Sequence, residues 1–155
     1  MKRILCFAVT LVFLGNVSHA QNKTVNSTSN YKGFKAPKLT TVIGEYKDSV
    51  QLTVEEAKKL LSLPIKISDG KNSYKVSSYQ FLYRKKNFIQ DESGRTAITN
   101  GTVSQLFRET PLDAIWIKTI REDLKSGEQL YFFDIIVKDG QGRVMYAPDV
   151  KIMVK

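Results

Sequence analysis

Three pairs of adjacent acidic residues are the places in the sequence where acid–base catalysis could be arranged. They are Glu55 with Glu56, Asp91 with Glu92, and Glu122 with Asp123. Two carboxyl groups can hydrolyse a glycoside when one donates a proton and the other acts as base or nucleophile. Each of these pairs falls in a helix cap or in a turn-like polar segment, where both carboxylates are solvated. The sequence therefore gives them no catalytic setting.

Nucleophilic and metal chemistry have equally little support. Ser77, Ser78 and Ser126 lack a G-x-S-x-G setting and a histidine partner, and no motif indicates a serine–lysine pair. The only cysteine, Cys6, and the only histidine, His19, lie among the first 20 residues. Without that segment the chain has no thiolate nucleophile, no histidine base and no Cys/His metal site. We expect a protein without enzymatic activity, metal or cofactor.

The first 20 residues have the pattern of a cleavable signal peptide. Lys2 and Arg3 precede an apolar stretch, residues 4–15, and Ser18 and Ala20 are the small residues that a signal peptidase reads. The alternative is a membrane anchor, but a spanning helix needs about 20 apolar residues, and this stretch is much shorter. We expect cleavage after Ala20, no transmembrane anchor afterwards, and a location in the periplasm or outside the cell.

Basic residues outnumber acidic ones in the exported chain. The signal peptide holds two of the 24 Lys and Arg residues and none of the 15 Asp and Glu residues, so the remainder has a net charge of +7. Such a surplus can indicate nucleic acid as a partner, but export argues against it. The one dense basic run is Arg84, Lys85 and Lys86. We interpret it as a solvated edge that discourages edge-to-edge strand pairing; the alternative is a site for an acidic partner or an anionic polymer.

One domain is expected after the signal peptide. Residues 21–38 are rich in Asn, Ser, Thr and Lys, and they predict a flexible polar leader. The domain is expected over residues 39–155, beginning with a short strand near Thr40. Two capping boxes predict short helices within it. Thr53 with Glu56 begins one that ends before the next proline, and Thr102 with Gln105 begins another that runs through Phe107.

Alternation of apolar and polar residues predicts the strands. Residues 74–84 form one whose apolar face changes phase at Ser77 and Ser78, which indicates a β-bulge there. Residues 114–121 form another, with apolar residues on both faces. Each of these strands is bounded by turn signals.

The clearest pattern is a closing hairpin of residues 131–137 and 144–154. Glycines in its turn supply the positive φ that tight hairpins require, and the turn pairs Val137 with Val144. About six or seven strands, one or two short helices and a turn every ten or so residues predict an all-β fold, namely an immunoglobulin-like β-sandwich.

Three segments, met in this order, resemble the C-terminal domain of the gliding-motility protein family GldM, called PorM in the type IX secretion system of Bacteroidetes. They are SYKVSSYQF at residues 73–81, TNGTVSQLF at 99–107, and FDIIVKDGQGRVMYAPDVKIMV at 133–154. The first is similar to a strand with a serine and an aromatic residue. The second is similar to an Asn-Gly turn before a short helix, and the third to a final Gly-rich hairpin. The resemblance covers residues from about 41 to the last.

The resemblance implies a periplasmic β-sandwich that works by contacting other proteins of the cell envelope. Members of that family span the inner membrane and carry several extracytoplasmic domains, whereas this sequence predicts a cleaved signal and a stand-alone domain. The family turn also has a proline before its aspartate, which is absent before Asp139 here. That difference could alter a contact at the hairpin tip.

We interpret the chain as an exported, non-catalytic protein–protein interaction module, accessory to a type IX secretion, gliding or other cell-envelope complex. The candidate contact residues are Arg84, Lys85 and Lys86, and Gly140, Gln141 and Arg143 at the hairpin tip. The alternative is a binder of an anionic or carbohydrate envelope ligand, with an enzyme as the third possibility. The oligomeric state and the identity of the partner stay open.

Overall fold

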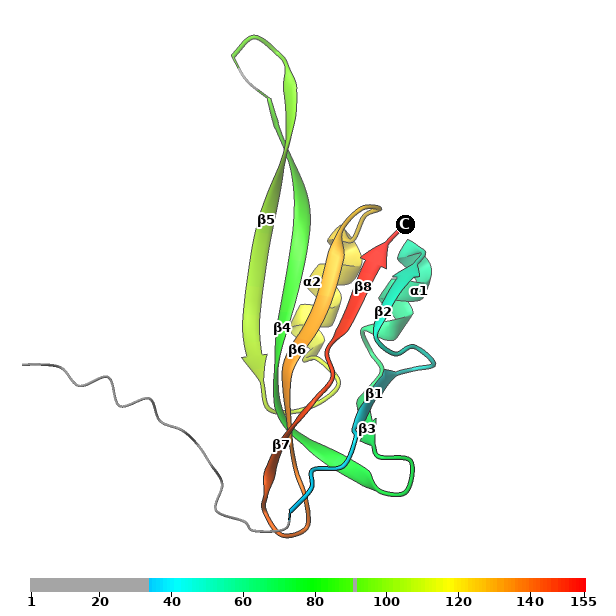
Figure 1. The fold of residues 1–155 in the computed structure, drawn as a ribbon. Coiled ribbons are helices and arrows are strands. Elements are labelled where there is room, and N and C mark those ends of the chain that lie inside the picture. Colours follow the sequence, from blue (N-terminus) through cyan, green and yellow to red (C-terminus); the bar gives the residue numbers. More distant parts are fainter. Residues whose placement is uncertain (1–33, 91) are drawn as a thin grey trace, which may run out of the picture. The chain divides into compact units, whose positions relative to one another are not determined.

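Eight strands and two helices are present in residues 34–90 and 92–155, which are the residues that the computed structural model describes (Figure 1). In chain order they are β1 Thr40–Ile43, β2 Ser49–Leu52, α1 Val54–Leu60, β3 Ile65–Ser68, β4 Ser73–Gln90, β5 Thr96–Phe107, α2 Ala114–Asp123, β6 Gln129–Lys138, β7 Val144–Ala147 and β8 Val150–Val154. The predicted signal peptide and most of the leader lie outside the described residues and stay predictions. The predicted first strand is confirmed as β1.

The strands form one curled sheet in the order β1-β3-β4-β6-β8-β2, with β5 also beside β4 and β7 also beside β6. The pairs are antiparallel except β2 with β8, which is parallel. The all-β class is thereby confirmed. No helix among the described residues is long and apolar enough to cross a membrane.

Aromatic side chains form the centre of the core, where α2 lies against β4, β5 and β6 (Figure 1). Tyr79 and Phe81 on β4 are fully buried, and Phe107 of β5 stacks on Tyr79 with ring centroids 5.5 Å apart. Trp116 of α2 meets Phe81 and Phe107 edge to face, at 5.7 and 5.6 Å. Phe132 of β6 completes the cluster, 4.9 Å from Phe81. Such aromatic pairs each add about 0.5–1.5 kcal/mol beyond their buried area, so this cluster fixes α2 on the sheet.

Two local predictions are confirmed in detail. The Thr53 hydroxyl accepts a hydrogen bond from the Glu56 amide at 3.3 Å, and the Glu56 carboxylate accepts one from the Thr53 amide at 2.8 Å, which completes the capping box of α1. The pairing of β4 with β6 shifts on both sides of Ser78, where the bulge was expected. The bulge allows Val76 before it and Tyr79 after it to be buried on the same face.

The predicted helix through residues 102–107 is wrong, because these residues belong to β5. All twelve residues of β5 pair with β4, from Thr96 opposite Gln90 to Phe107 opposite Tyr79. Val103, Leu106 and Phe107 have the spacing of a helical apolar stripe, but in the strand only Phe107 is buried. The β-branched residues and the long partner strand override the local capping pattern.

The predicted strand at residues 114–121 is also wrong, because it is helix α2. Leu112, Trp116, Ile120 and Leu124 recur every four residues, and this spacing puts them on one side of a helix. All but Trp116 are buried, and Trp116 is half-buried. The alternation of Ile115 and Ile117 does not reflect a buried face, since Ile115 is 78% exposed.

The closing hairpin exists, but its register differs by one residue from the prediction. Val137 pairs with Met145 rather than with Val144. The loop is one residue longer than expected because the Asp139 carboxylate accepts hydrogen bonds from the amides of Gln141 and Arg143, both at 2.9 Å. The single second strand that was expected is divided at Pro148 into β7 and β8. As a result Val144 is exposed.

Candidate interaction surface

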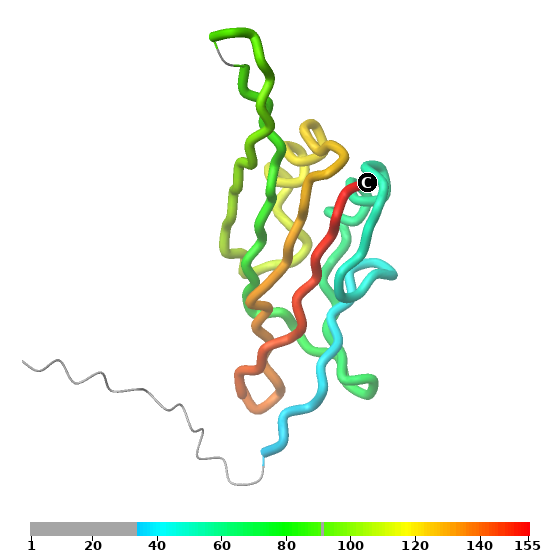
Figure 2. The backbone as a smooth tube through the Cα atoms, turned by 45° about the horizontal axis from the view of Figure 1, so that its top comes forward, coloured from blue at the N-terminus to red at the C-terminus, as the bar shows by residue number. Residues whose placement is uncertain are grey.

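The long hairpin of β4 and β5 projects beyond the rest of the sheet (Figures 1 and 2). Strand β6 pairs with β4 only as far as Gln129 opposite Arg84. Beyond that point residues 85–90 of β4 pair with β5 alone. We call residues 85–90 and 92–101, which form this two-stranded extension and the described part of its turn, the arm. Isolated two-stranded ribbons are at best marginally stable in water, so the arm needs either a strong base or a partner.

The base of the arm is held by a buried carboxylate, Glu128, which is fully buried. Its carboxylate accepts hydrogen bonds from the Tyr83 hydroxyl at 2.5 Å, from the Lys86 amide at 3.0 Å and from the Lys125 amide at 3.0 Å. Burial, with a further contribution from the Glu128 bond, raises the pKa of the Tyr83 hydroxyl far above its ordinary value. These three hydrogen bonds offset the free-energy cost of burying the Glu128 side chain.

The predicted basic run contributes to this base. The Lys85 ammonium lies 2.5 Å from the Asp123 carboxylate of α2, and this hydrogen bond, with the ammonium charge, lowers the pKa of the Asp123 carboxyl. Lys86 donates its amide to Glu128, and its side chain crosses Gly127 so closely that a Cβ there would lie 1.9 Å from the ammonium nitrogen. Arg84 is exposed. Two of the three residues in the basic run therefore have structural partners.

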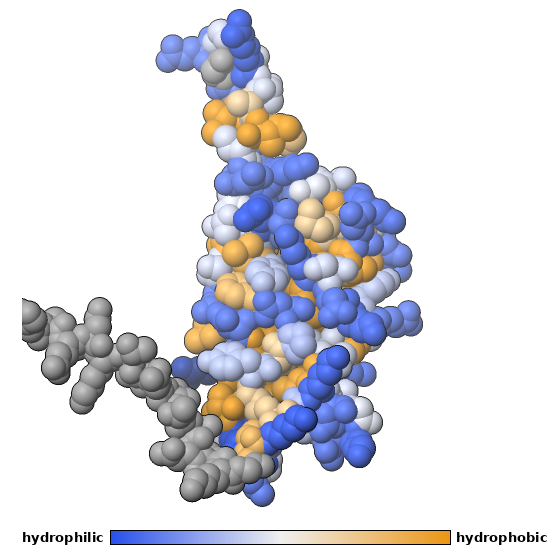
Figure 3. Space-filling view, in the orientation of Figure 1, coloured by the Kyte–Doolittle hydropathy of each residue, from blue (hydrophilic) through white to orange (hydrophobic). Residues whose placement is uncertain are grey.

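Apolar side chains are exposed on the arm itself. Phe88, Ile89 and Ile98 are 61%, 53% and 63% exposed. Figure 3 shows an apolar band on the arm between two hydrophilic zones. Phe88 lies opposite Ile98 on one face, and Ile89 lies opposite Ala97 on the other. Exposing apolar side chains on both faces of a ribbon to water is unfavourable, and such exposed patches mark surfaces that another chain covers.

The outer edge of β5 has no strand beside it among the described residues, because β5 pairs with β4 alone. Its sequence TAITNGTVSQLF contains neither a charged residue nor a proline. Natural sheets protect exposed edges with charges, prolines, bulges or very short strands. At twelve residues, β5 has none of these devices, so its edge is open to pairing with another strand.

A groove borders this edge on the face that α2 covers. It has a volume of about 240 Å³ and lies between α2 and the β4–β5 strands. Val103 and Ile115, which are 50% and 78% exposed, border it together with half-buried Trp116. The indole N–H of Trp116 donates to the Gln105 side chain at 3.0 Å, which fixes α2 relative to β5. The groove is mostly apolar, with the Lys85–Asp123 ion pair also in its lining, and Val103 of the free edge borders it.

The predicted site at the hairpin tip lies at the other end of the sheet. Arg143 donates from Nε to the Asp139 carboxylate at 2.6 Å, so the two side chains hold the loop together. Gly140 and Gln141 are exposed and line a polar pocket of about 380 Å³ with residues of the β3–β4 turn. The tip and the basic run are thus not brought together into one surface.

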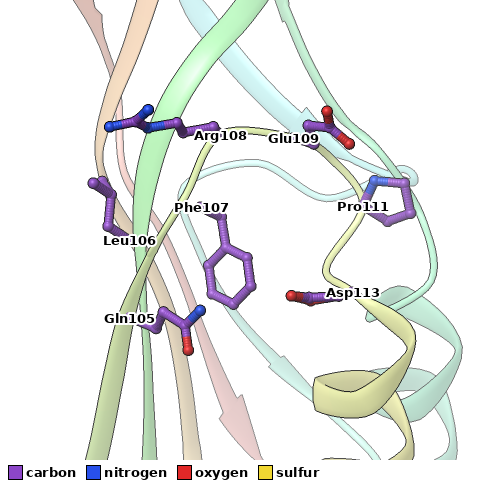
Figure 4. A pocket seen from close by; sticks show the side chains of 7 residues that line it. All are labelled: Gln105, Leu106, Phe107, Arg108, Glu109, Pro111 and Asp113. Atoms are coloured by element: carbon purple, nitrogen blue, oxygen red, sulfur yellow. The ribbon is translucent and has the colours of Figure 1, made fainter.

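A third hollow, of about 320 Å³, lies where β5 leads into α2 (Figure 4). Phe107 and Asp113 point toward each other across it, while Arg108 points away. Its described lining contains no serine, cysteine, histidine or lysine. Its acidic residues are Glu109 and Asp113, and neither has one of these nucleophiles or bases beside it in the lining.

The structure places one residue of each carboxylate pair as follows. Glu56 caps α1, Glu92 lies in the turn of the arm, and Asp123 pairs with Lys85. No group of three His, Cys, Asp or Glu residues in the described ranges is arranged to hold a metal ion. No protein-family model and no curated protein matches this sequence.

Proposed function

We propose that this chain is an exported, non-catalytic protein-interaction module that binds its partner by adding a strand to the free edge of β5. The observation that supports the proposal is the edge itself, a strand of twelve residues without a charge or a proline. In strand addition, backbone hydrogen bonds supply affinity and pockets for alternate side chains supply specificity. The groove beside Val103 and Ile115 is a pocket of that kind.

The resemblance to the GldM C-terminal domain supports a partner in the cell envelope, in a type IX secretion, gliding or other complex. The second of the three segments that suggest it forms a strand here rather than a turn and a short helix, which weakens the resemblance. The predicted signal peptide supports a periplasmic or secreted location. The immunoglobulin-like sandwich, as a finer description of the all-β fold, stays a prediction.

The proposal is tested by capture from a detergent-solubilised cell envelope. The tagged, processed chain is compared with a variant carrying Thr102→Lys and Ser104→Lys, because lysine on an edge discourages strand addition. Both positions are exposed, so neither change removes a buried contact. We expect the variant to lose the polypeptides that the wild type retains.

The matched control carries Val144→Lys and Tyr146→Lys on β7, which adds the same charge on a strand of only four residues. It should retain what the wild type retains. Equal capture by the wild type and the Thr102 and Ser104 variant would contradict strand addition at β5.

A second candidate function rests on the polar pocket at the hairpin tips. Asn72, Tyr74, Lys138 and Gln141 line it, and such side chains suit a carbohydrate or an anionic polymer. Binding of the chain to envelope polysaccharide, lost in Lys138→Ala with Gln141→Ala and sensitive to salt, would favour this function. Unchanged binding in that variant would exclude the pocket.

A further inference from the structure

Strand β5 is complementary to itself in one antiparallel register. Ile98 and Leu106, which are 63% and 48% exposed, lie on the same face of β5. When two copies of β5 pair antiparallel about a twofold axis at Thr102, Ile98 of each copy lies opposite Leu106 of the other. An axis one residue to either side would put Ile98 opposite Ser104 or Arg108 instead. The apolar pattern therefore selects a single register.

The same register extends a row of apolar side chains that already exists on the arm. Phe88 lies opposite Ile98 and is 61% exposed. In the pair of strands, Leu106 of the second copy continues this row, so Phe88, Ile98 and that Leu106 follow one another across three strands. The row occurs twice because of the symmetry. Cross-strand apolar pairs of this kind are the main side-chain stabilisation of a sheet.

The charges of the arm do not oppose such a pair. Residues 97–107, which meet in this register, carry no charge. Arg84 lies opposite Thr102 on β4, so the two copies of Arg84 are separated by three strand spacings, or about 14 Å. That exceeds the screening length of about 8 Å at physiological ionic strength. The positive charge of Lys85 is offset by its ion pair with Asp123.

The axis also brings the two apolar grooves together. Val103 is adjacent to Thr102 in the strand, and Ile115 borders the same groove. Opposite Val103 the second copy presents Gly101, which has no side chain to obstruct the approach. The β5 strand of each copy then lies directly beside the groove of the other.

We propose that β5 pairs with β5 of a second copy of this chain, antiparallel and with the twofold axis at Thr102. The pairing uses the free edge of both copies and so closes as a dimer rather than continuing as a fibre. The inference rests on the proposed function, because it names the chain that adds its strand to β5.

Cysteine cross-linking tests both the pairing and its register. In a Cys6→Ser background the chain has no other cysteine, so single cysteines can be introduced on the outer face of β5. Residues directly opposite in an antiparallel pair have Cα atoms about 4.5–5.5 Å apart, which a disulfide can bridge. We expect Thr102→Cys to cross-link with itself. Asn100→Cys and Ser104→Cys should each stay uncross-linked alone and cross-link when mixed.

Sedimentation equilibrium of the processed chain measures the dimer directly. Ile98→Asp with Leu106→Asp removes both apolar cross-strand pairs and places like charges directly opposite each other, so we expect the dissociation constant to rise about 100-fold or more. Tyr146→Asp is the control, since Tyr146 is 71% exposed on β7 and lies outside the pairing. Circular dichroism should show that both variants keep the fold.

The possible results separate this inference from the proposed function. A monomer at all concentrations would overturn the dimer, and equal cross-linking of Asn100→Cys alone and in the mixture would overturn its register. If that monomer still captures another polypeptide through β5, the proposed function stands and only the identity of the partner was wrong. If it captures nothing, both fail.

Discussion

Removing the acceptor at Glu128 should destabilise the domain and loosen the arm. Glu128 is fully buried and accepts hydrogen bonds from the Tyr83 hydroxyl and from the amides of Lys86 and Lys125. A buried donor left without an acceptor costs about 1–3 kcal/mol. The two amides are only partly buried, so about 1 kcal/mol each and about 2 kcal/mol for the hydroxyl give about 4 kcal/mol for Glu128→Ala.

Two conservative variants refine this expectation. Glu128→Gln keeps the side-chain volume, but its amide nitrogen must face at least one of the three donors, so we expect a loss of about 2 kcal/mol. Tyr83→Phe removes one donor and leaves the carboxylate with two backbone partners, so we expect about 1 kcal/mol. The loss at Glu128→Gln should therefore exceed the loss at Tyr83→Phe.

Urea denaturation followed by circular dichroism measures these differences, and Glu45→Gln at an exposed position is the control, expected within about 0.5 kcal/mol of wild type. Amide hydrogen exchange at Lys86 should become faster in both Glu128 variants. The reasoning is refuted if Glu128→Ala and Glu128→Gln both unfold within about 0.5 kcal/mol of wild type.

Other predictions concern single side chains. Gly127→Ala should cost more than Gly70→Ala, because both glycines have positive φ but only a Cβ at Gly127 would displace the Lys86 side chain; equal unfolding free energies would show that the displacement of Lys86 has no cost. Tyr79→Phe should leave stability unchanged or raise it by up to about 1 kcal/mol, because the buried Tyr79 hydroxyl has no hydrogen-bond partner among the described residues; a clear loss of stability would indicate a partner. The pKa of the Asp69 carboxyl is held well below its ordinary value, first by the Asn72 amide. Its stabilising effect should therefore be full above the ordinary carboxyl pKa of about 4 and be lost as the pH falls below it, and Asp69→Asn should lack this acid sensitivity in unfolding measurements; an unchanged pH profile would contradict it.

Local signals predicted the parts of the fold that local interactions determine. The capping box at Thr53 is a contact between residues three apart, and the phase change at Ser78 is visible in the alternation of apolar residues alone. Both were correct because no distant segment competes with them. The all-β class followed from the number of such strands and turns.

One error occurred where a distant segment decides the local conformation, and another where two local patterns compete. The Asn100-Gly101 pair and the residues after it have the pattern of a turn and a helix start, but pairing with β4 makes them the middle of a strand. For α2, the spacing of Trp116 and Ile120 was a usable helical signal, and the alternation around Ile115 obscured it.

The candidate surface was only partly accessible to sequence reasoning. The basic run was recognised, but not that Lys85 pairs with Asp123 or that Lys86 lies over Gly127. Those contacts join segments about 40 residues apart, and the alternation of apolar and polar residues along the sequence cannot predict them. The absence of charged residues from 96–107 is visible in the sequence. It indicates a binding edge only once these residues are known to form the outer strand of the sheet.

The most direct test of the account is amide hydrogen exchange of residues 96–107 in the processed chain, measured dilute, concentrated, and in the presence of solubilised envelope. Strand addition at β5 predicts protection of alternate amides in this segment, the ones that face away from β4, under at least one of the last two conditions. Protection that appears on concentration alone indicates the second copy of the chain, and protection that needs the envelope indicates another polypeptide. Exchange that stays equally fast under all three conditions would contradict the claim that β5 is a binding edge.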